Sequence, residues 1–267
     1  MSKCQRYTIG SVFPKYLKMP RKTKTAVLEQ ISTQGQALLI KQHRIAHTTR
    51  VRFVEIQGAE LRHLFDEALD LTHYAKSCQR VGRCMRLALV HDARWVGGVV
   101  LGSTFPNVDV RDRALGLKVY VSGFALRGLS NPWSGKNREY WNCLQSIVNH
   151  ARTFIFPQFQ GRGFGKEAHR ALLGDGIKLW ESKYNEKVYA LDTLCDHSDS
   201  GLFLSNGWIH VGETKGFTAD YRKSFTLRKK VTPSINNAAL SPGPTRWQVW
   251  VRTIRPSLRP LAGQGSS

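Results

Sequence analysis

Acidic residues are scarce in this chain of 267 residues, since 19 Asp and Glu stand against 40 Lys and Arg and leave a formal net charge of +21. No stretch approaches the roughly 20 uncharged apolar residues that a membrane-spanning helix requires. Residues 1–24 contain scattered cations but lack the apolar segment of a secretory signal. With 41% hydrophobic and 22% charged residues, the composition is that of a folded protein and excludes a disordered or collagen-like chain.

Cysteine is sparse as well. The five cysteines are an odd number, and none of them forms a Cys-x-x-Cys pair. This pattern argues against a disulfide framework and against a structural zinc site, so we expect a reducing, cytoplasmic location. The cysteines are Cys4, Cys78, Cys84, Cys143 and Cys195.

The positive charge is concentrated at the two ends of the sequence. Residues 1–50 contain ten Lys and Arg and one acid, and residues 221–267 contain nine Lys and Arg and no acid. Each segment therefore carries +9, and residues 51–220 carry only +3. Basic arms of this kind typically neutralise the phosphates of nucleic acid. Solvated tails are the alternative interpretation, and a membrane surface is disfavoured because neither arm has an amphipathic helical stripe.

Hydrophobic periodicity predicts a mixed α/β domain over residues 51–220, between the two arms. Two strands joined by the turn His91–Arg94 are typical of a hairpin. Further along, strand, glycine loop, helix and strand follow one another, which predicts some parallel pairing. The predicted strands are 51–57, 85–90, 95–103, 119–126, 152–159, 187–194 and 208–212, and the predicted helices are 24–42, 58–72, 138–149, 166–183 and 199–206.

A glycine loop, Gln160-Gly161-Arg162-Gly163-Phe164-Gly165, precedes one of these helices. Its spacing is neither the GxGxxG dinucleotide motif nor a Walker loop. Alternating glycines still let the backbone approach a ligand, and free N–H groups at a helix N-terminus attract an anion such as pyrophosphate. Arg162 and Lys166 add positive charge there. A tight turn without a ligand is the alternative interpretation.

This loop resembles the Q/R-x-x-G-x-G/A motif of the GNAT acyltransferases, which binds the pyrophosphate of acyl-coenzyme A. The downstream order is also similar, with Asn206-Gly207-Trp208 where that family usually has Leu-Gly-Phe. The resemblance implies a GNAT-like fold in which residues 160–166 bind acyl-CoA, acetyl-CoA being the first choice. Where the family often has a tyrosine that acts as general acid, this chain has Phe203, which has no proton to donate.

A second set of motifs extends over residues 73–217. The motifs are His73-Tyr74, Arg80-Val81-Gly82, the strands around Gly97–Gly102, Arg111-Asp112, Trp133-Ser134, Asn149, Arg152-Thr153-Phe154-Ile155, Asn206-Gly207-Trp208 and Gly212-Glu213-Thr214-Lys215-Gly216. Their order resembles the family of the Druantia anti-phage protein DruA and, more distantly, that of the phage Mu DNA-modification protein Mom. Both families are GNAT-like, and Mom modifies adenine in DNA so that restriction enzymes fail to cut it. The resemblance implies a bacterial or phage-infected host cell.

Modification of a base amine requires a group that takes a proton. We place Asp192 first, as base or orienter, because it ends a strand beside the expected cofactor cleft; a capping aspartate is the alternative. His73, its neighbour Tyr74, and Asp112 are the other candidate catalytic residues, with a packed histidine and an ion pair to the preceding arginine as structural alternatives. No set of residues has strong metal-ligand spacing, although His73, Asp192 and His197 would form a ligand set if they met in space.

Candidate contacts with nucleic acid combine aromatic and polar side chains. Indole rings stack on displaced bases, and polar or cationic groups orient them. Buried packing is the alternative for a tryptophan, but the basic C-terminal arm favours nucleic-acid contact for the two tryptophans it contains. The full set is Arg111, Trp133, Asn149, Arg152, Trp208, Lys215, Trp247 and Trp250.

Together these features predict a GNAT-like enzyme that transfers a small acyl-derived group from acyl-CoA to a base amine, with double-stranded DNA as its partner. Two alternatives stay open. A DruA-like nucleic-acid-binding defence protein without transfer chemistry is favoured by Phe203. A protein or small-amine N-acetyltransferase is disfavoured by the basic arms, which such an enzyme does not need.

Overall fold

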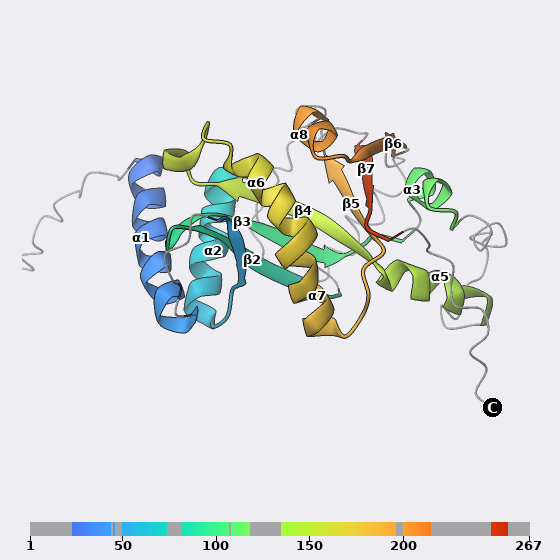
Figure 1. Ribbon diagram of the computed structural model, residues 1–267, viewed down its shortest axis with the longest axis horizontal. Helices are drawn as coiled ribbons and strands as arrows, with labels where there is room; N and C mark the ends of the chain where they lie inside the picture. The colour runs from blue at the N-terminus through green and yellow to red at the C-terminus, as the bar shows by residue number, and fades with distance from the viewer. Residues whose placement is uncertain are drawn as a thin grey trace, which may run out of the picture.

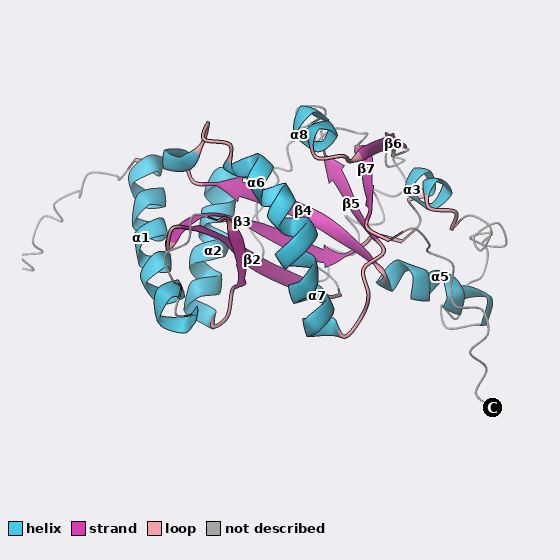
Figure 2. Cartoon of the chain, in the orientation of Figure 1, coloured by secondary structure: helices cyan, strands magenta, loops and turns pink. Residues whose placement is uncertain are grey.

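A computed structural model describes residues 23–43, 45, 50–73, 82–106, 108–117, 135–195, 200–214 and 247–255. These residues form a seven-stranded mixed sheet with helices on both faces (Figure 1, Figure 2). The mixed α/β class predicted from the sequence is therefore confirmed. The strands are β1 (Arg52–Glu55), β2 (Cys84–His91), β3 (Arg94–Ser103), β4 (Ile147–Ile155), β5 (Ala190–Cys195), β6 (Ile209–Glu213) and β7 (Gln248–Thr253).

The helices lie between these strands in sequence. None of those in the described part of the chain has the length and apolar character of a membrane span. They are α1 (Lys24–His43), α2 (Ala59–Thr72), α3 (Asp109–Ala114), α5 (Gly135–Gln145), the 3-10 turn η1 (Pro157–Phe159), α6 (Phe164–Ala171), the π segment η2 (Leu172–Gly176), α7 (Ile177–Tyr184) and α8 (Ser200–Ser205). The segments α6, η2 and α7 form one continuous crossover from β4 to β5, as parallel pairing requires.

The strand order is β1-β2-β3-β4-β5-β7-β6. Neighbouring strands are antiparallel except for β4 and β5, which are parallel. The hairpin predicted at His91–Arg94 joins β2 to β3, and its two central residues, Asp92 and Ala93, have φ values of 49° and 58°. These positive angles match the right-handed twist of the flanking strands without a glycine.

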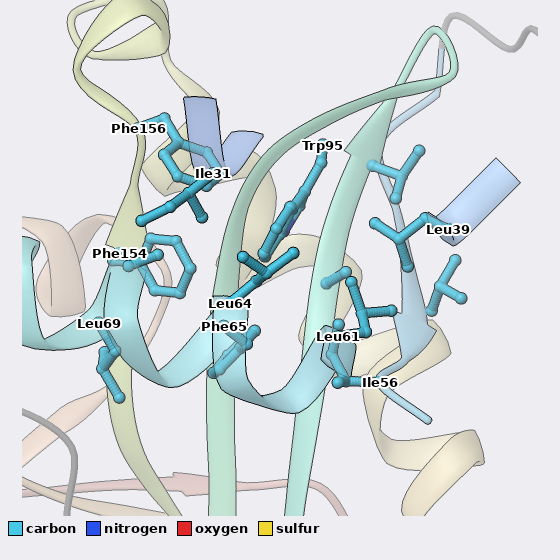
Figure 3. Close-up of a cluster of buried hydrophobic side chains, with 14 of the residues drawn as sticks. Ile31, Leu39, Ile56, Leu61, Leu64, Phe65, Leu69, Trp95, Phe154 and Phe156 are labelled. Carbon is cyan, nitrogen blue, oxygen red and sulfur yellow. The ribbon is translucent and has the colours of Figure 1, made fainter. Parts of the chain in front are cut away.

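One face of the sheet is covered by α1 and α2 (Figure 1). Figure 3 shows Phe65 of α2 among Trp95 of β3 and Phe154 of β4, and its ring centroid lies 6.3 Å from the first and 5.2 Å from the second. Gly35 of α1 permits this packing, because a Cβ there would lie 2.0 Å from the Trp95 ring. We call this the α1–α2 face.

The opposite face is covered by α6 and α7, which cross in front of the strands in Figure 1. Side chains alternate between the two faces along each strand. On β2, for example, Leu87 and Leu89 point to this second core, whereas Ala88 and Val90 belong to the core under α1 and α2. We call this the α6–α7 face.

Two segments that the sequence assigns to basic arms belong to this folded unit. Helix α1 confirms the predicted helix 24–42 but contributes Leu28, Ile31 and Leu39 to the core, so residues 24–43 are not an arm. Strand β7 is inserted between β5 and β6, which corrects the boundary at residue 221. Apolar side chains at helical and strand spacing outweigh the local charge in both segments.

Two predicted boundaries around β4 are also corrected. The helix predicted at 138–149 ends at Gln145, and the strand predicted at 152–159 begins at Ile147 and ends at Ile155. Residues 147–149 become strand because all three pair with β5, and Val148 and Asn149 also pair with β3. These partners are distant in sequence, so local periodicity does not show them. The strand predicted at 119–126 lies outside the described residues.

Candidate active site

The site is built where β4 and β5 part. The two strands pair over only three positions, Ile147–Asn149 with Ala190–Asp192, although both continue beyond them. They diverge after this point (Figure 1). From His150 onward the edge of β4 that faces β5 has no strand pairing among the described residues. One side-chain contact bridges the beginning of the opening, because the Thr193 hydroxyl donates to the carbonyl of His150 at 2.8 Å.

A β-bulge lies at the same place in β4. The register with β3 pairs Leu101 with His150 and Val100 with Arg152, so Ala151 is the extra residue. Bulges bend a strand and redirect its side chains, and they are frequent beside active sites. In this chain the bulge marks the first turn of β4 away from β5. We refer to the space between the diverging strands as the opening.

The predicted glycine loop, Gln160-Gly161-Arg162-Gly163-Phe164-Gly165, follows η1 after β4, and its last two residues are the first two of α6. Gly161 and Gly163 have φ values of 73° and 82°, a left-handed conformation that favours glycine. A Cβ at either position would contact nothing within 4 Å, so the requirement is conformational and the space beside the loop is open. The left-handed Gly163 is the N-cap of α6 and turns the chain into the helix.

Positive charge surrounds this helix start. The carbonyl of Gly163 accepts the first helical hydrogen bond, from the N–H of Glu167 at 3.1 Å. The N–H groups before it belong to the first turn, where a helix offers no internal acceptor. Arg162 and Lys166 are exposed, and neither has an ion-pair partner among residues that the structure describes. The loop thus presents N–H groups, a helix dipole and two cations to one open space.

A buried polar network lies at the bottom of the opening. Asp192 of β5 accepts hydrogen bonds from Asn149 Nδ2 at 2.8 Å and from Arg111 Nη1 at 2.8 Å. The hydroxyl of Thr104 also donates to Asp192. Because Val148 and Leu191 point into the α6–α7 core, Asn149 and Asp192, each one residue further, point to the α1–α2 face. The network therefore belongs to that side of the sheet.

Arg111 joins this network to the segment between β3 and β4. Its side chain is 0% exposed, and its Nε donates to Asp112 at 2.8 Å. Tyr140 completes the cluster by donating its hydroxyl to the other oxygen of Asp112 at 2.9 Å. Burial disfavours the charged guanidinium, but the charges of Asp192 and Asp112 outweigh this effect and raise the pKa of Arg111 above its ordinary value. The arginine therefore stays charged between two buried carboxylates.

These contacts define what Asp192 can do. Its two carboxylate oxygens accept hydrogen bonds from a guanidinium, a hydroxyl and an amide, and its side chain is buried. A carboxylate held in this way fixes the positions of the groups that donate to it. These contacts are compatible with the orienting role predicted for Asp192, and its role as a base stays a prediction. Asp112 likewise serves as the ion-pair partner of Arg111.

The remaining predicted catalytic residues are His73 and Tyr74. His73 is the C-cap of α2, a helix of the α1–α2 face, and its backbone N–H donates to the Leu69 carbonyl at 2.9 Å. Tyr74 and His197 lie outside the described residues, so the ligand set of His73, Asp192 and His197 stays untested. In the part of the chain that the structure describes, no three His, Cys, Asp or Glu residues are grouped so that they could hold a metal ion.

An aromatic cluster lies on the other side of the opening, on the α6–α7 face. Its members come from β4, α6, α8, the residue before β6, and β7. They are His150, His169, Phe203, Trp208 and Trp250. The ring centroids of His150 and His169 are 5.0 Å apart, and that of Phe203 lies 5.3 Å from His169. The position where the resemblance leads one to expect a tyrosine is thus next to two imidazoles.

Two of the predicted nucleic-acid contacts are corrected by this cluster. Trp208 is 3% exposed and Trp250 is 2% exposed, and the Trp250 ring stacks on Phe203 with centroids 5.7 Å apart. Both indoles are packed in the core, so neither can stack on a displaced base. Trp250 is buried because it lies on β7, whose pairing with β5 and β6 the sequence did not reveal.

The other predicted contacts have mixed placements. Asn149 and Arg111 are buried in the network described above, and Arg152 of β4 donates to the carbonyl of Ala151 at 2.7 Å. Trp247 is half-buried, and its backbone N–H donates to the Thr214 hydroxyl at 3.0 Å. Two predicted contacts, Trp133 and Lys215, lie outside the described residues.

Sequence reasoning missed His169. It lies next to Ala168 and one helical turn before Leu172 and Leu173, on a helix predicted from its apolar stripe alone. A histidine flanked by two buried positions of an amphipathic helix is the signal that would have found it. The sequence analysis also missed Thr104 and Tyr140, because neither residue lies in a recognisable motif.

No protein-family model and no curated protein sequence matches the chain. Solved structures that resemble it include the ribosomal-protein-S18-alanine N-acetyltransferase of Escherichia coli, at 11% identity and a TM-score of 0.40, over 81% of this chain and 99% of that chain. A Bacillus subtilis acetyltransferase in complex with CoA is similar at 11% identity and a TM-score of 0.39, over 76% of this chain and 99% of that one.

A GNAT family acetyltransferase from Elizabethkingia anophelis with acetyl-CoA bound is similar at 11% identity and a TM-score of 0.38, over 77% of this chain and 99% of that chain. Likenesses at such identities and TM-scores decide neither the fold nor the activity of this chain. What the chain does is therefore inferred from its own loop, opening and side chains.

Proposed function

We propose that the chain is an N-acyltransferase that takes its acyl group from acyl-coenzyme A. One observation carries this proposal: a left-handed glycine loop at a helix N-terminus lies at one end of β4, and β4 parts from β5 at its other end. The loop suits the phosphates of the coenzyme, and the strand edge suits its extended arm. The thioester supplies an activated acyl group.

The loop fits a pyrophosphate for electrostatic reasons. First-turn N–H groups and the positive end of the helix dipole favour an anion. Arg162 and Lys166 add two exposed cations at the same place. Gly161 and Gly163 hold the backbone in its left-handed path and leave the space beside it open. These residues would hold the phosphate end of the coenzyme.

The edge of β4 fits an extended chain that contains amides. An open strand edge offers N–H and C=O groups with which such a chain can pair, as in peptide recognition by strand addition. The five steps from His150 to Ile155 span about 17 Å at ~3.4 Å per residue. The pantetheine arm of coenzyme A is an extended chain with two amide groups. The loop at one end of this edge and the point where β4 parts from β5 at the other end thus match the two ends of that arm.

The Asp192 network gives the opening its shape. Asn149 and Asp192 are the last paired residues of the two strands, and their side chains are bonded to each other. Arg111 ties this pair to the segment between β3 and β4. The network holds the strands together up to one point and no further, which fixes where the arm ends and where an amine can reach the acyl carbon.

Binding of acetyl-CoA to the full chain, measured by isothermal titration calorimetry, tests the proposal. We expect the wild-type chain to bind, and Gly163→Glu to lose at least about tenfold in affinity, because the substitution places an anion and backbone strain in the phosphate loop. Equal binding by wild type and Gly163→Glu would contradict the assignment of the loop.

Gly116→Glu is the matched control. Gly116 also has a left-handed φ, 72°, and a Cβ there would meet no atom within 4 Å, but it lies in the turn after α3. The control therefore carries the same charge change and the same kind of backbone strain away from the loop. We expect it to bind acetyl-CoA as the wild type does, within about twofold.

We further propose that the acceptor is an amine of a DNA base. The support is the net charge of +21, of which +9 lies in each terminal segment, because such a charge favours a polyanionic partner. A small-molecule acyltransferase does not require it. Much of that charge lies in residues 1–22, 215–246 and 256–267, outside the described residues.

Mass spectrometry of nucleosides tests the acceptor. The wild-type chain, Gly163→Glu and Gly116→Glu are each expressed in bacteria, and the cellular DNA is digested to nucleosides. We expect a new adduct with the wild type and with Gly116→Glu, and none with Gly163→Glu. A chain that binds acetyl-CoA but leaves DNA unchanged would contradict the DNA acceptor and favour a protein or small amine.

A second candidate function is nucleic-acid binding without transfer, as in the DruA-like alternative. The buried Phe203 favours it, because a phenyl ring in contact with His169 and Trp208 has no proton to donate to a leaving group. Salt-sensitive DNA binding by a chain that does not bind acetyl-CoA would support this candidate against the first.

A further inference from the structure

His169 is buried without hydrogen bonds. Its side chain is 2% exposed, and neither ring nitrogen has a hydrogen-bond partner among the described residues. In that part of the chain it is the one side chain with two such atoms. An unsatisfied buried polar group costs ~1–3 kcal/mol, and native proteins retain few of them. Two unsatisfied nitrogens in one imidazole ring therefore suggest that the ring has a function.

The ring lies beside the opening. His169 belongs to α6, the helix that starts at the glycine loop, and its ring centroid is 5.0 Å from that of His150. His150 is the first residue of β4 beyond the parallel pairing with β5. The helix thus carries the phosphate loop at its N-terminus and His169 over the other end of the proposed arm.

The surroundings suit a sulfur atom. Phe203 and Trp208 lie 5.3 and 5.9 Å from the His169 ring, centroid to centroid. A sulfur atom beside His169 would lie among aromatic rings, with which sulfur makes favourable contacts, whereas a hydrated anion would find no cation among these contacts. Burial lowers the pKa of His169 to about 4, so at neutral pH its imidazole is uncharged and carries one N–H donor.

We propose that the N–H of His169 donates a hydrogen bond to the sulfur of coenzyme A and stabilises the thiolate that leaves on acyl transfer. This inference rests on the proposed function. In the transfer, a bond forms between the amine nitrogen and the acyl carbon, the carbon–sulfur bond breaks, and its electron pair stays on sulfur. The amine releases its extra proton to solvent. His169 keeps its own proton throughout, which a neutral imidazole can do.

Two substitutions separate hydrogen bonding from packing. His169→Phe retains an aromatic ring but has no N–H, and His169→Gln loses the ring but keeps an N–H donor. The readout is the ultraviolet absorbance of the coenzyme A thiolate, titrated with pH while free coenzyme A is bound to the full chain. We expect the thiol pKa of the bound coenzyme to be about one unit higher in His169→Phe than in the wild type, which is a tenfold change. His169→Gln should restore part of this difference.

Affinity and stability provide the controls. We expect His169→Phe to bind acetyl-CoA within about twofold of the wild type, because the thioester sulfur carries no charge. We also expect its melting temperature to be equal or higher, since two unsatisfied polar atoms are removed. If His169→Phe does not fold, His169→Leu takes its place as the variant without a donor.

The outcomes separate this inference from the proposed function. If coenzyme A binds and its thiol titrates identically in the wild type and in His169→Phe, the role of His169 is overturned and the proposed function stands. If the wild-type chain does not bind coenzyme A, the proposed function fails and the inference fails with it. A raised thiol pKa that Gln partly restores supports the inference, because a role in packing alone would favour the aromatic variant.

Discussion

Two buried polar clusters meet at the opening between β4 and β5, from opposite faces of the sheet, and they differ in how their polar atoms are satisfied. On the α1–α2 face, the side chain of Asp192 has both oxygens bonded and that of Arg111 binds two carboxylates. On the α6–α7 face, His169 is buried with both ring nitrogens unbonded among the described residues. A saturated network fixes geometry, whereas an unsaturated ring keeps its donor for a ligand.

The largest expected effect comes from breaking the saturated cluster. Arg111→Met removes the cation between Asp112 and Asp192 and leaves two buried carboxylates unpaired. We expect the free energy of unfolding to fall by about 3–5 kcal/mol, measured by urea denaturation. Arg113→Met on the same helix is the control, because Arg113 is exposed and its replacement should cost less than about 0.5 kcal/mol. If Arg111→Met lowers the free energy of unfolding no more than Arg113→Met does, the network around Arg111 does not stabilise the fold.

Because of His169, the free energy of unfolding should depend on pH. His169 has a pKa of about 4 when folded and an ordinary value of 6.5, so between these values the unfolded chain binds more protons. The folded chain therefore pays no proton-linked cost for His169 above pH 6.5, and its free energy of unfolding decreases as pH falls toward 4. The loss reaches roughly 3 kcal/mol. Within the contacts described, His150 is the titratable group that faces it.

Urea denaturation at a series of pH values measures this loss. We expect His169→Phe to be less sensitive to pH in that range than the wild type, by up to the same amount. His63→Phe is the control, because His63 is exposed on α2 and should leave the pH dependence as it is in the wild type. If the free energy of unfolding depends on pH in the same way in the wild type and in His169→Phe, the buried ring does not cause the loss of stability at low pH.

The smallest expected effect compares single hydroxyl groups. Tyr140 donates to the buried carboxylate of Asp112, whereas Tyr184 donates to the backbone carbonyl of Cys84 at 3.0 Å. Hydrogen bonds to charged groups contribute more, so Tyr140→Phe should lower the free energy of unfolding by ~1.5–3 kcal/mol and Tyr184→Phe by ~1 kcal/mol. Thermal and urea denaturation check the order. The reverse order would weaken the distinction between the charged network and ordinary hydrogen bonds.

Local patterns predicted the parts of the fold that local interactions determine. Apolar spacing located α2 and the β2–β3 hairpin, and the glycines marked the start of α6, where two left-handed φ angles require them. Features that depend on pairing between strands far apart in the sequence could not be predicted in this way. Strand β7 follows a long interval after β6, and only its pairing with β5 and β6 explains why Trp250 is buried.

The same limit applies to the candidate site. Asp192 was identified because the sequence placed it at the end of a strand. In the structure it is the third residue of β5, and its contacts come from Arg111 and Thr104 in another part of the sequence. His169 was not identified as a candidate at all. Its helix was predicted from its apolar face, and nothing in the neighbouring residues shows that its ring nitrogens lack partners.

The position of β7 also has a consequence for biosynthesis. Strand β5 forms one wall of the opening and pairs with β7 along its whole length, yet β7 is the last strand of the described chain. During synthesis on the ribosome, β4, the glycine loop and α6 therefore emerge long before β7 is available to pair with β5. We expect the site to become competent only after β7 has emerged, so that a chain arrested before residue 248 exposes one edge of β5 to chaperones or to aggregation.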